Sequence, residues 1–328
     1  MRQFFTTSTK VILSEAKSRG IKTSVYVPGH IAKLSYKNHI EYLYHQFCSQ
    51  TSAVAFESCH TKDVTKELLK KNKVSVAKGD SFSNKEKNKA ITYAKTLKWP
   101  LVLKPTNGAH GDAVFANIKN NIDFVAAWNN ITKNYQNVIV EERFEGKEYR
   151  IFATENKLIG VINRIPANVI GDGKHTIQEL VDIKNSDPRR GDRSYTKPLI
   201  KISIDDLVIK KLKKNHLTLK YTPKINEQIF LKDTSNLSTG GDSIDFTNKI
   251  HPSIKKIAIN TVRAIPGLKY AGIDLMTSDI TKQQTNKTYI IVEVNASPGL
   301  DMHHFPYEGK PRDAAGAIID IMFPETKK

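Results

Sequence analysis

The pattern of apolar and polar residues along the chain predicts short strands and separate helices, with no long repeat of either. Short apolar runs bounded by glycine, proline or asparagine are typical of strands. We expect strands at 23–27, 101–105, 138–142, 148–152, 158–162, 271–276 and 291–295. The polar dipeptide at 156–157 separates two of these runs and predicts a hairpin.

Apolar positions three and four residues apart predict helices in other segments. They are expected at 10–19, 40–47, 62–71, 84–98 and 252–265. In the third of these segments, Val64 and Leu68 lie on one side and are expected to form the buried face. Residues 167–240 are rich in turn-forming residues, so we expect loops there. Hairpins mixed with separate helices indicate an α+β fold and not a repeating βαβ fold.

Two of the predicted strands carry acidic and amide side chains in the pattern of a metal site. Side chains alternate between the faces of a strand, so Glu293 and Asn295 point to the same side. Asp274 adds a carboxylate in the middle of the preceding predicted strand. Mg²⁺ prefers oxygen ligands of this kind and commonly shares them with phosphates. The three residues therefore predict a metal–nucleotide site, although a single acid on a strand is more often only solvated.

Further charged residues fit the recognition of a nucleotide. Lys104 ends a strand just before a loop of small residues at 106–114, where an ammonium group can reach phosphates that loop N–H groups also bind. This loop lacks the G-x-x-x-x-G-K-[ST] pattern of a Walker A motif. Glu141 and Glu148 could accept hydrogen bonds from adenine and ribose, and the backbone of 142–144 could bind the adenine edge. Taken singly, each of these residues also fits a solvated surface.

Composition limits the class of protein. The chain has 328 residues, of which 39% are hydrophobic and 26% charged, as in a globular protein of two or three subdomains. It has no apolar run of a membrane span and no apolar N-terminal signal, so we expect no membrane partner. Two cysteines give neither a disulfide framework nor a zinc site, so we expect a cytoplasmic protein. The net charge of +18 is spread along the chain, which favours attraction of ATP or an acidic substrate over nucleic acid.

The order of these motifs resembles the ATP-grasp superfamily over about residues 50–325. The resemblance is most specific in three strings. They are R-I-P-A-N-V-I-G-D-G-K-H-T at 164–176, N-L-S-T-G-G-D-S-I-D at 236–245 and H-H-F-P-Y-E-G-K-P-R at 303–312. These strings are similar to the ATP-grasp modules of cyanophycin synthetases and of bifunctional glutathione-synthesising enzymes.

The resemblance implies three groups of site residues. ATP would be bound by Lys62, Lys104, Glu141, Glu142, Arg143, Phe144 and Glu148. Two Mg²⁺ ions, or Mn²⁺ in their place, would be held by Asp274, Glu293 and Asn295. Arg164 would face the charge of the transferred phosphoryl group, Asn295 would assist catalysis, and Arg312 would shape the acceptor site together with the loop at 238–242.

The resemblance also implies an organisation and an activity. A short N-terminal α/β segment at 1–60 would precede two ATP-grasp subdomains at 61–140 and 141–328. We expect a stand-alone ligase that joins a carboxylate and an amine through an acyl phosphate, with an amino acid or a small or acidic peptide as substrate. Because relatives often self-associate, a homodimer is the expected assembly. Three alternatives remain: a glutathione-synthetase-type ligase, an enzyme that adds amino acids to a protein or peptide tail, and a non-catalytic nucleotide-binding protein.

Overall fold

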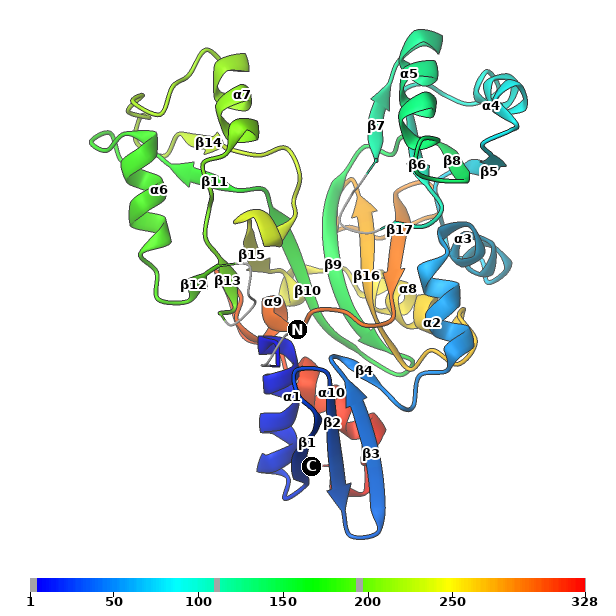
Figure 1. The fold of residues 1–328 in the computed structure, drawn as a ribbon, viewed down its shortest axis with the longest axis vertical. Coiled ribbons are helices and arrows are strands. Elements are labelled where there is room, and N and C mark those ends of the chain that lie inside the picture. The colour runs from blue at the N-terminus through cyan, green and yellow to red at the C-terminus, as the bar shows by residue number, and fades with distance from the viewer. Residues whose placement is uncertain (1–4, 109–112, 193–196, 328) are drawn as a thin grey trace. The chain divides into compact units, whose positions relative to one another are not determined.

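The computed structural model describes residues 5–108, 113–192 and 197–327, which form two compact units (Figure 1). Unit 1 comprises 1–50, 159–248 and 297–328, and unit 2 comprises 51–158 and 249–296. These units are defined by contacts in space, whereas the predicted ranges 1–60, 61–140 and 141–328 follow the chain, and that division stays a prediction. Among the described residues, no helix has both the length and the apolar character needed to cross a membrane.

Unit 2 contains antiparallel strands in two groups. The first group, in spatial order, is β5 (Gly79–Ser83), β8 (Asn137–Glu142), β6 (Leu101–Pro105) and β7 (Phe115–Ile118). The second is β9 (Lys147–Thr154), β16 (Tyr270–Thr277) and β17 (Tyr289–Asn295). The helices of this unit are α2 (Ala53–His60), α3 (Lys62–Lys71), α4 (Lys87–Ala94), α5 (Asn121–Ile131) and α8 (Pro252–Arg263). The five strands predicted for this unit are confirmed, and the helix expected at 84–98 is confirmed in shortened form.

The core of the first strand group explains why α5 forms. Phe124 and Trp128 lie four residues apart on its inner face, and both are almost fully buried. They pack in one cluster with strand residues that include Leu101, Leu103 and Val140. Burial of large aromatic side chains contributes about 1.5–3 kcal/mol each, so this cluster holds β6 and β8 in place.

Helix α3 begins and ends where the sequence predicts, but it buries a different face. Thr65, Lys66 and Leu69 are its buried residues, whereas Val64 is 42% exposed. The expectation was therefore wrong for Val64, whereas Leu68 is half-buried. The spacing of apolar residues does not identify the buried face here because that face includes a lysine, Lys66. Its burial depends on Glu141, which is distant in the sequence.

Unit 1 combines a small antiparallel meander with further strands and helices. The meander is β1 (Lys22–Val27), β2 (Ile31–Tyr36), β3 (His39–Tyr44) and β4 (Phe47–Cys48), and α1 (Thr7–Ser18) packs with α10 (Ala314–Met322) beside it (Figure 1). The other strands are β10 (Leu158–Ile165), β11 (Asn168–Ile170), β12 (Arg190–Gly191), β13 (Leu199–Ile200), β14 (Gln228–Phe230) and β15 (Asp242–Asp245). The other helices are α6 (Ile177–Asn185), α7 (Asp206–Lys214) and α9 (Asp301–His304), with 3-10 turns η1 (Leu237–Thr239), η2 (Thr247–Lys249) and η3 (Pro324–Thr326).

Two predictions for unit 1 were wrong. Residues 40–47 were expected to be helical, but 39–44 form β3, because burial alternates along them. Glu41 and Leu43 are buried and Ile40 is exposed, which is the period of two of a strand. The loops expected at 167–240 include the two helices α6 and α7, and α6 begins with a complete capping box at Thr176.

The C-terminal turn η3 is attached to β3 through a histidine. The ring of His39 lies between two carboxylates, with Nδ1 2.8 Å from Glu325 Oε1 and Nε2 3.1 Å from Glu41 Oε1. Glu41 is buried and also accepts hydrogen bonds from Ser49 and Gln50. The hydrogen bond to Glu325, reinforced by Glu41, raises the pKa of His39 above 6.5.

We expect this contact to make stability depend on pH. Because the folded-state pKa of His39 is raised, its contribution is fully present below about pH 6.5 and is lost as pH rises through the folded-state pKa. Urea unfolding of wild type and His39→Gln should therefore differ most in acid and converge in alkali. In a Glu325→Gln background the effect of His39→Gln should shrink, and an effect that stays constant with pH would contradict the interpretation.

Candidate functional site

The carboxylate of Glu141 is bound by two lysine side chains in unit 2. Lys66 Nζ lies 2.6 Å from one carboxylate oxygen and Lys104 Nζ lies 2.6 Å from the other. All three residues are less than 9% exposed. Charge-assisted hydrogen bonds of this length are the strong class, so three buried charges hold α3, β6 and β8 together.

Strand register brings this cluster together. Val102 on β6 lies opposite Glu141 on β8, and Lys104 follows two residues later on the same face. On the other side of β8, Gly79 of β5 lies opposite Glu141. A Cβ atom at Gly79 would lie 2.4 Å from the carbonyl oxygen of Val140, so this close approach of the two strands requires glycine.

The charges of the cluster perturb one another. Burial opposes ionisation of Glu141, but Lys104 and Lys66 outweigh it and hold the pKa of this carboxyl below its usual range. Burial lowers the pKa of Lys66, although Glu141 opposes the shift. Two ammonium groups face one carboxylate, so the cluster keeps an excess of positive charge that an anion could neutralise.

Lys62 lies four residues before Lys66 on α3. Its Nζ donates to the backbone oxygen of Gly108 at 2.7 Å and lies 3.9 Å from Glu293. Burial lowers the pKa of Lys62, and Glu293 opposes the shift. Residues 109–112 of the predicted phosphate loop lie outside the described residues, so only its beginning, at Gly108, is placed beside this lysine.

The three predicted metal ligands lie on the paired strands β16 and β17. Asp274 is directly opposite Glu293, and Asn295 is opposite Gly272, whose carbonyl oxygen it contacts at 3.4 Å through Nδ2. Asp274 is bound by Arg150 of β9, with Nε–Oδ1 and Nη2–Oδ2 distances of 2.5 and 3.0 Å. The structure thus brings together the two carboxylates that the sequence singled out and supplies a cation beside one of them.

The predicted adenine hinge comprises the last two residues of β8 and the two residues that follow, 141–144. The N–H groups of Glu142 and Arg143 donate to Lys78 and Pro100 within the fold, and a Glu142 carboxylate oxygen accepts from the Lys98 N–H. These backbone donors are therefore already engaged.

Phe144 is half-buried directly after the hinge donors, and Glu148 lies on β9 opposite Met276. The binding roles of the hinge residues and of Glu148 stay predictions.

The two predicted arginines belong to unit 1. Arg164 lies on β10 opposite Ser243 of β15. Arg312 forms an ion pair with Asp245, at 2.5 Å between Nη2 and Oδ2. Burial opposes ionisation of Asp245, but the hydrogen bond from Arg312 and its other partners hold the pKa of this carboxyl below its usual range. The catalytic roles of both arginines stay predictions.

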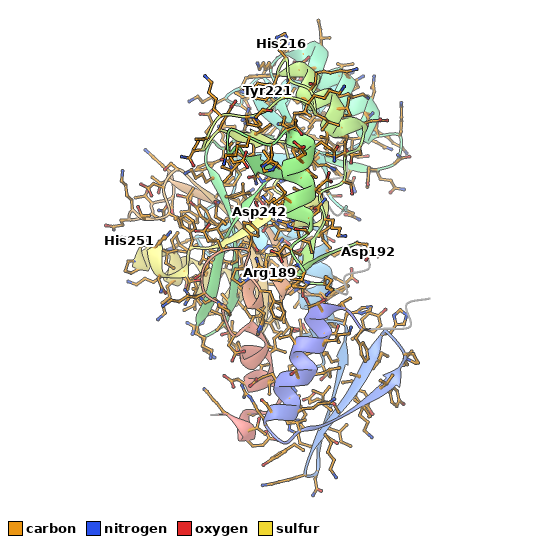
Figure 2. The ribbon with its side chains drawn as sticks, turned by 90° about the vertical axis from the view of Figure 1, so that its left-hand side faces the viewer. Arg189, Asp192, His216, Tyr221, Asp242 and His251 are labelled. Atoms are coloured by element: carbon orange, nitrogen blue, oxygen red, sulfur yellow. The ribbon has the colours of Figure 1, made fainter. Side chains whose placement is uncertain are left out.

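The end of the predicted acceptor loop is anchored in unit 1. Asp242, labelled in Figure 2, is 4% exposed. It pairs with Arg190 and Lys184, each at 2.5 Å. Arg190 also lies over the ring of Tyr307, at 5.3 Å from its centroid. Because Asp242 is fully engaged, its predicted contribution to the acceptor site would be to position the loop at 238–242.

The chain is similar in sequence to known proteins. The family model described as RimK-like ATP-grasp domain matches residues 231–321. The glutathione biosynthesis bifunctional protein of Clostridium perfringens is 35% identical over 319 residues, 96% of this chain and 41% of the relative. A cyanophycin synthetase of Trichormus variabilis is 34% identical over 318 residues, 97% of this chain and 35% of the relative. The chain spans less than half the length of both.

The chain is also similar in fold to solved structures. The bifunctional glutathione synthetase from Pasteurella multocida superposes with a TM-score of 0.79 at 32% identity, over 98% of this chain and 44% of the other. Residues 231–321 thus match an ATP-grasp domain, and the chain resembles these larger proteins over nearly all of its own length. A D-alanine–D-alanine ligase from Bacillus anthracis, at 14% identity and a TM-score of 0.51 over 84% of this chain and 70% of the other, shares the fold.

ATP-grasp enzymes generally use ATP and divalent metal ions, and the residues of unit 2 fit both. The surplus positive charge around Glu141 suits phosphates, which carry several negative charges. Asp274, Glu293 and Asn295 supply the hard oxygen donors that Mg²⁺ takes. Among the described residues, no three His, Cys, Asp or Glu side chains lie close enough together to hold a metal on their own. Bound phosphate oxygens would complete the ligand set.

Sequence reasoning missed two charged residues that contact the candidate site residues Glu141 and Asp274. Lys66 lies one helical turn after Lys62, on the same face of α3, and that spacing was a usable signal. Arg150 lies two residues after Glu148 on β9, and therefore on the same face of that strand. Its pairing with Asp274 follows from strand register, which pattern alone does not supply.

We expect Lys66→Met to lower the free energy of unfolding by about 2 kcal/mol, because it removes one of the two buried charge-assisted hydrogen bonds that Glu141 accepts, while Lys104 still balances the carboxylate. Urea unfolding of the full chain measures this. Lys70→Met is the matched control, since Lys70 is on the same helix but is exposed and pairs only with exposed Glu67. Equal effects of the two substitutions would show that the Glu141 cluster does not stabilise the fold.

Proposed function

We propose that this chain is an ATP-dependent ligase that joins a carboxylate to an amine. The observation that carries the proposal is the cluster of Lys66, Lys104 and Glu141, whose surplus of positive charge lies in the same unit as Asp274 and Glu293. Similarity to a glutathione biosynthesis protein and to cyanophycin synthetases over nearly the whole chain supports it.

In the proposed reaction, the γ-phosphoryl group of ATP passes to a substrate carboxylate, and an amine displaces phosphate from the acyl phosphate to form an amide. Lys62 and Lys104 would bind the phosphates. Because both lysines lie away from water, their attraction to a phosphate is stronger than it would be on an exposed surface. Asp274, Glu293 and Asn295 would hold Mg²⁺ or Mn²⁺, which neutralises charge on the transferred group. Positioning and electrostatics supply most of the rate enhancement in phosphoryl transfer.

The proposed substrates are an amino acid or a small peptide. A glutathione-synthetase-type reaction, joining γ-glutamyl-cysteine and glycine, is the second candidate. It is favoured by the 32% identity and TM-score of 0.79 to the bifunctional glutathione synthetase. Addition of amino acids to an acidic protein or peptide tail is the third, favoured by the net charge of +18.

We expect Mg²⁺-dependent release of ADP when the chain is given ATP and the correct pair of substrates. A panel of amino acids, γ-glutamyl-cysteine with glycine, and acidic peptides covers the three candidates, and mass spectrometry identifies the amide. Release of ADP without a new amide mass, or no release with any pair, would contradict the proposed ligase.

Glu293→Gln is expected to lower this rate about a hundredfold, because it removes a carboxylate that would hold the metal beside the reacting phosphates. Glu67→Gln removes the same charge from an exposed position of unit 2 and should leave the rate unchanged. If Glu293→Gln were as active as Glu67→Gln, the predicted metal site would be wrong.

A further inference from the structure

Unit 1 contains an open cavity of about 340 Å³ whose lining includes Arg312 but none of the predicted ATP or metal residues. It is lined by Val11, Ser14 and Glu15 of α1, by His304 at the end of α9, and by residues 311–313 before α10. Its volume falls in the usual range for pockets that bind small molecules. The lining combines two carboxylates, a guanidinium, an imidazole and a hydroxyl, so its charge decides which ligand it suits.

Two of the charged groups in the cavity are already neutralised. Glu15 pairs with Arg19 at 2.6 Å, and Arg312 pairs with Asp245 at 2.5 Å. Asp313 differs: one of its oxygens accepts the Gly316 N–H at 2.7 Å, as the N-cap of α10, and it has no cationic partner among the described residues. The charge left over in the cavity is therefore negative, in a chain whose net charge is +18.

His304 does not compensate this negative charge. The Ala315 N–H donates to Nε2 of His304 at 2.9 Å, so Nε2 carries the lone pair and the neutral ring holds its proton on Nδ1. Burial lowers the pKa of His304, and the nearby carboxylates of Asp313 and Glu15 only partly oppose this. The ring is therefore neutral near pH 7.

The remaining lining residues fit a short aliphatic stem. Val11 and Pro311 offer apolar surface, while the exposed hydroxyl of Ser14 adds an acceptor beside the carboxylates. We propose that this cavity binds a primary alkylammonium group, held by the charge of Asp313 and by the hydroxyl of Ser14, with its stem against Val11 and Pro311. The inference goes beyond the proposed ligase, since it requires neither ATP nor any residue of unit 2.

Isothermal titration of the full chain without ATP tests the proposal with three probes: putrescine, glycine and propionate. Saturable binding of putrescine, of glycine or of both supports it, and the comparison identifies the source of the ammonium group. If only putrescine binds, the ligand is a diamine, and if only glycine binds, it is an amino acid. If both bind, the cavity recognises the ammonium group whatever the remainder of the molecule. Binding of neither, or propionate binding as tightly as the ammonium probes, would overturn it.

Asp313→Asn should weaken binding of the ammonium probe about tenfold, because a neutral amide replaces the charge-assisted partner. Asparagine caps helices as well as aspartate does, so α10 is retained. Asp206→Asn, an exposed position in the first turn of α7, makes the same charge change outside the cavity and should not alter affinity. Equal affinities of the two variants would overturn the assignment.

Ser14→Lys provides a second variant that does not touch a helix cap. Ser14 is exposed on α1, and a lysine there would place a competing ammonium group at the cavity, so probe binding should be abolished. Undiminished binding would contradict the site. ATP binding to the same variants, measured separately, distinguishes the two proposals, because loss of ligase activity with retained ammonium binding would overturn only the proposed function.

Discussion

The buried carboxylate of Glu141 and its two ammonium partners form the interaction on which unit 2 depends. Lys66 comes from α3, Lys104 from β6 and Glu141 from β8, so three segments separated in the sequence meet at one point. Removing such charges from water costs several kcal/mol per ion, and only the full set of contacts offsets that cost. The same set leaves one positive charge in excess, so the group that holds the fold is also where the proposed function would bind phosphate.

On the paired strands β16 and β17, two carboxylates lie close together and are balanced by cations from other segments. Asp274 and Glu293 lie directly across from each other, and like charges so placed repel. Arg150 neutralises Asp274, and Lys62 lies 3.9 Å from Glu293. Each of the two carboxylates thus has a cation of the protein nearby, and in the proposed function a metal ion would be held between them and the phosphates.

Sequence patterns predicted what depends on near neighbours. The strands holding Lys104, Asp274 and Glu293 and the limits of α3 are local features, set by apolar runs and turn residues, and they were confirmed. The buried face of α3 was not predictable in that way. Lys66 is buried because Glu141 lies beside it in space, 75 residues further along the chain, and apolar spacing cannot represent a compensated charge.

In unit 1, too, the sequence does not show which carboxylates are paired with cations. Asp242 and Asp245 lie at the two ends of the short strand β15 and Asp313 lies directly before α10, and the environments of the three carboxylates differ. Asp242 has two cationic partners, Asp245 has one, and Asp313 has none among the described residues. Only the last keeps a charge to offer to a ligand. Because a carboxylate recruits a ligand when its charge is not already balanced, the distribution of ion pairs, more than the positions of acids in the sequence, determines where this chain can bind a small cation.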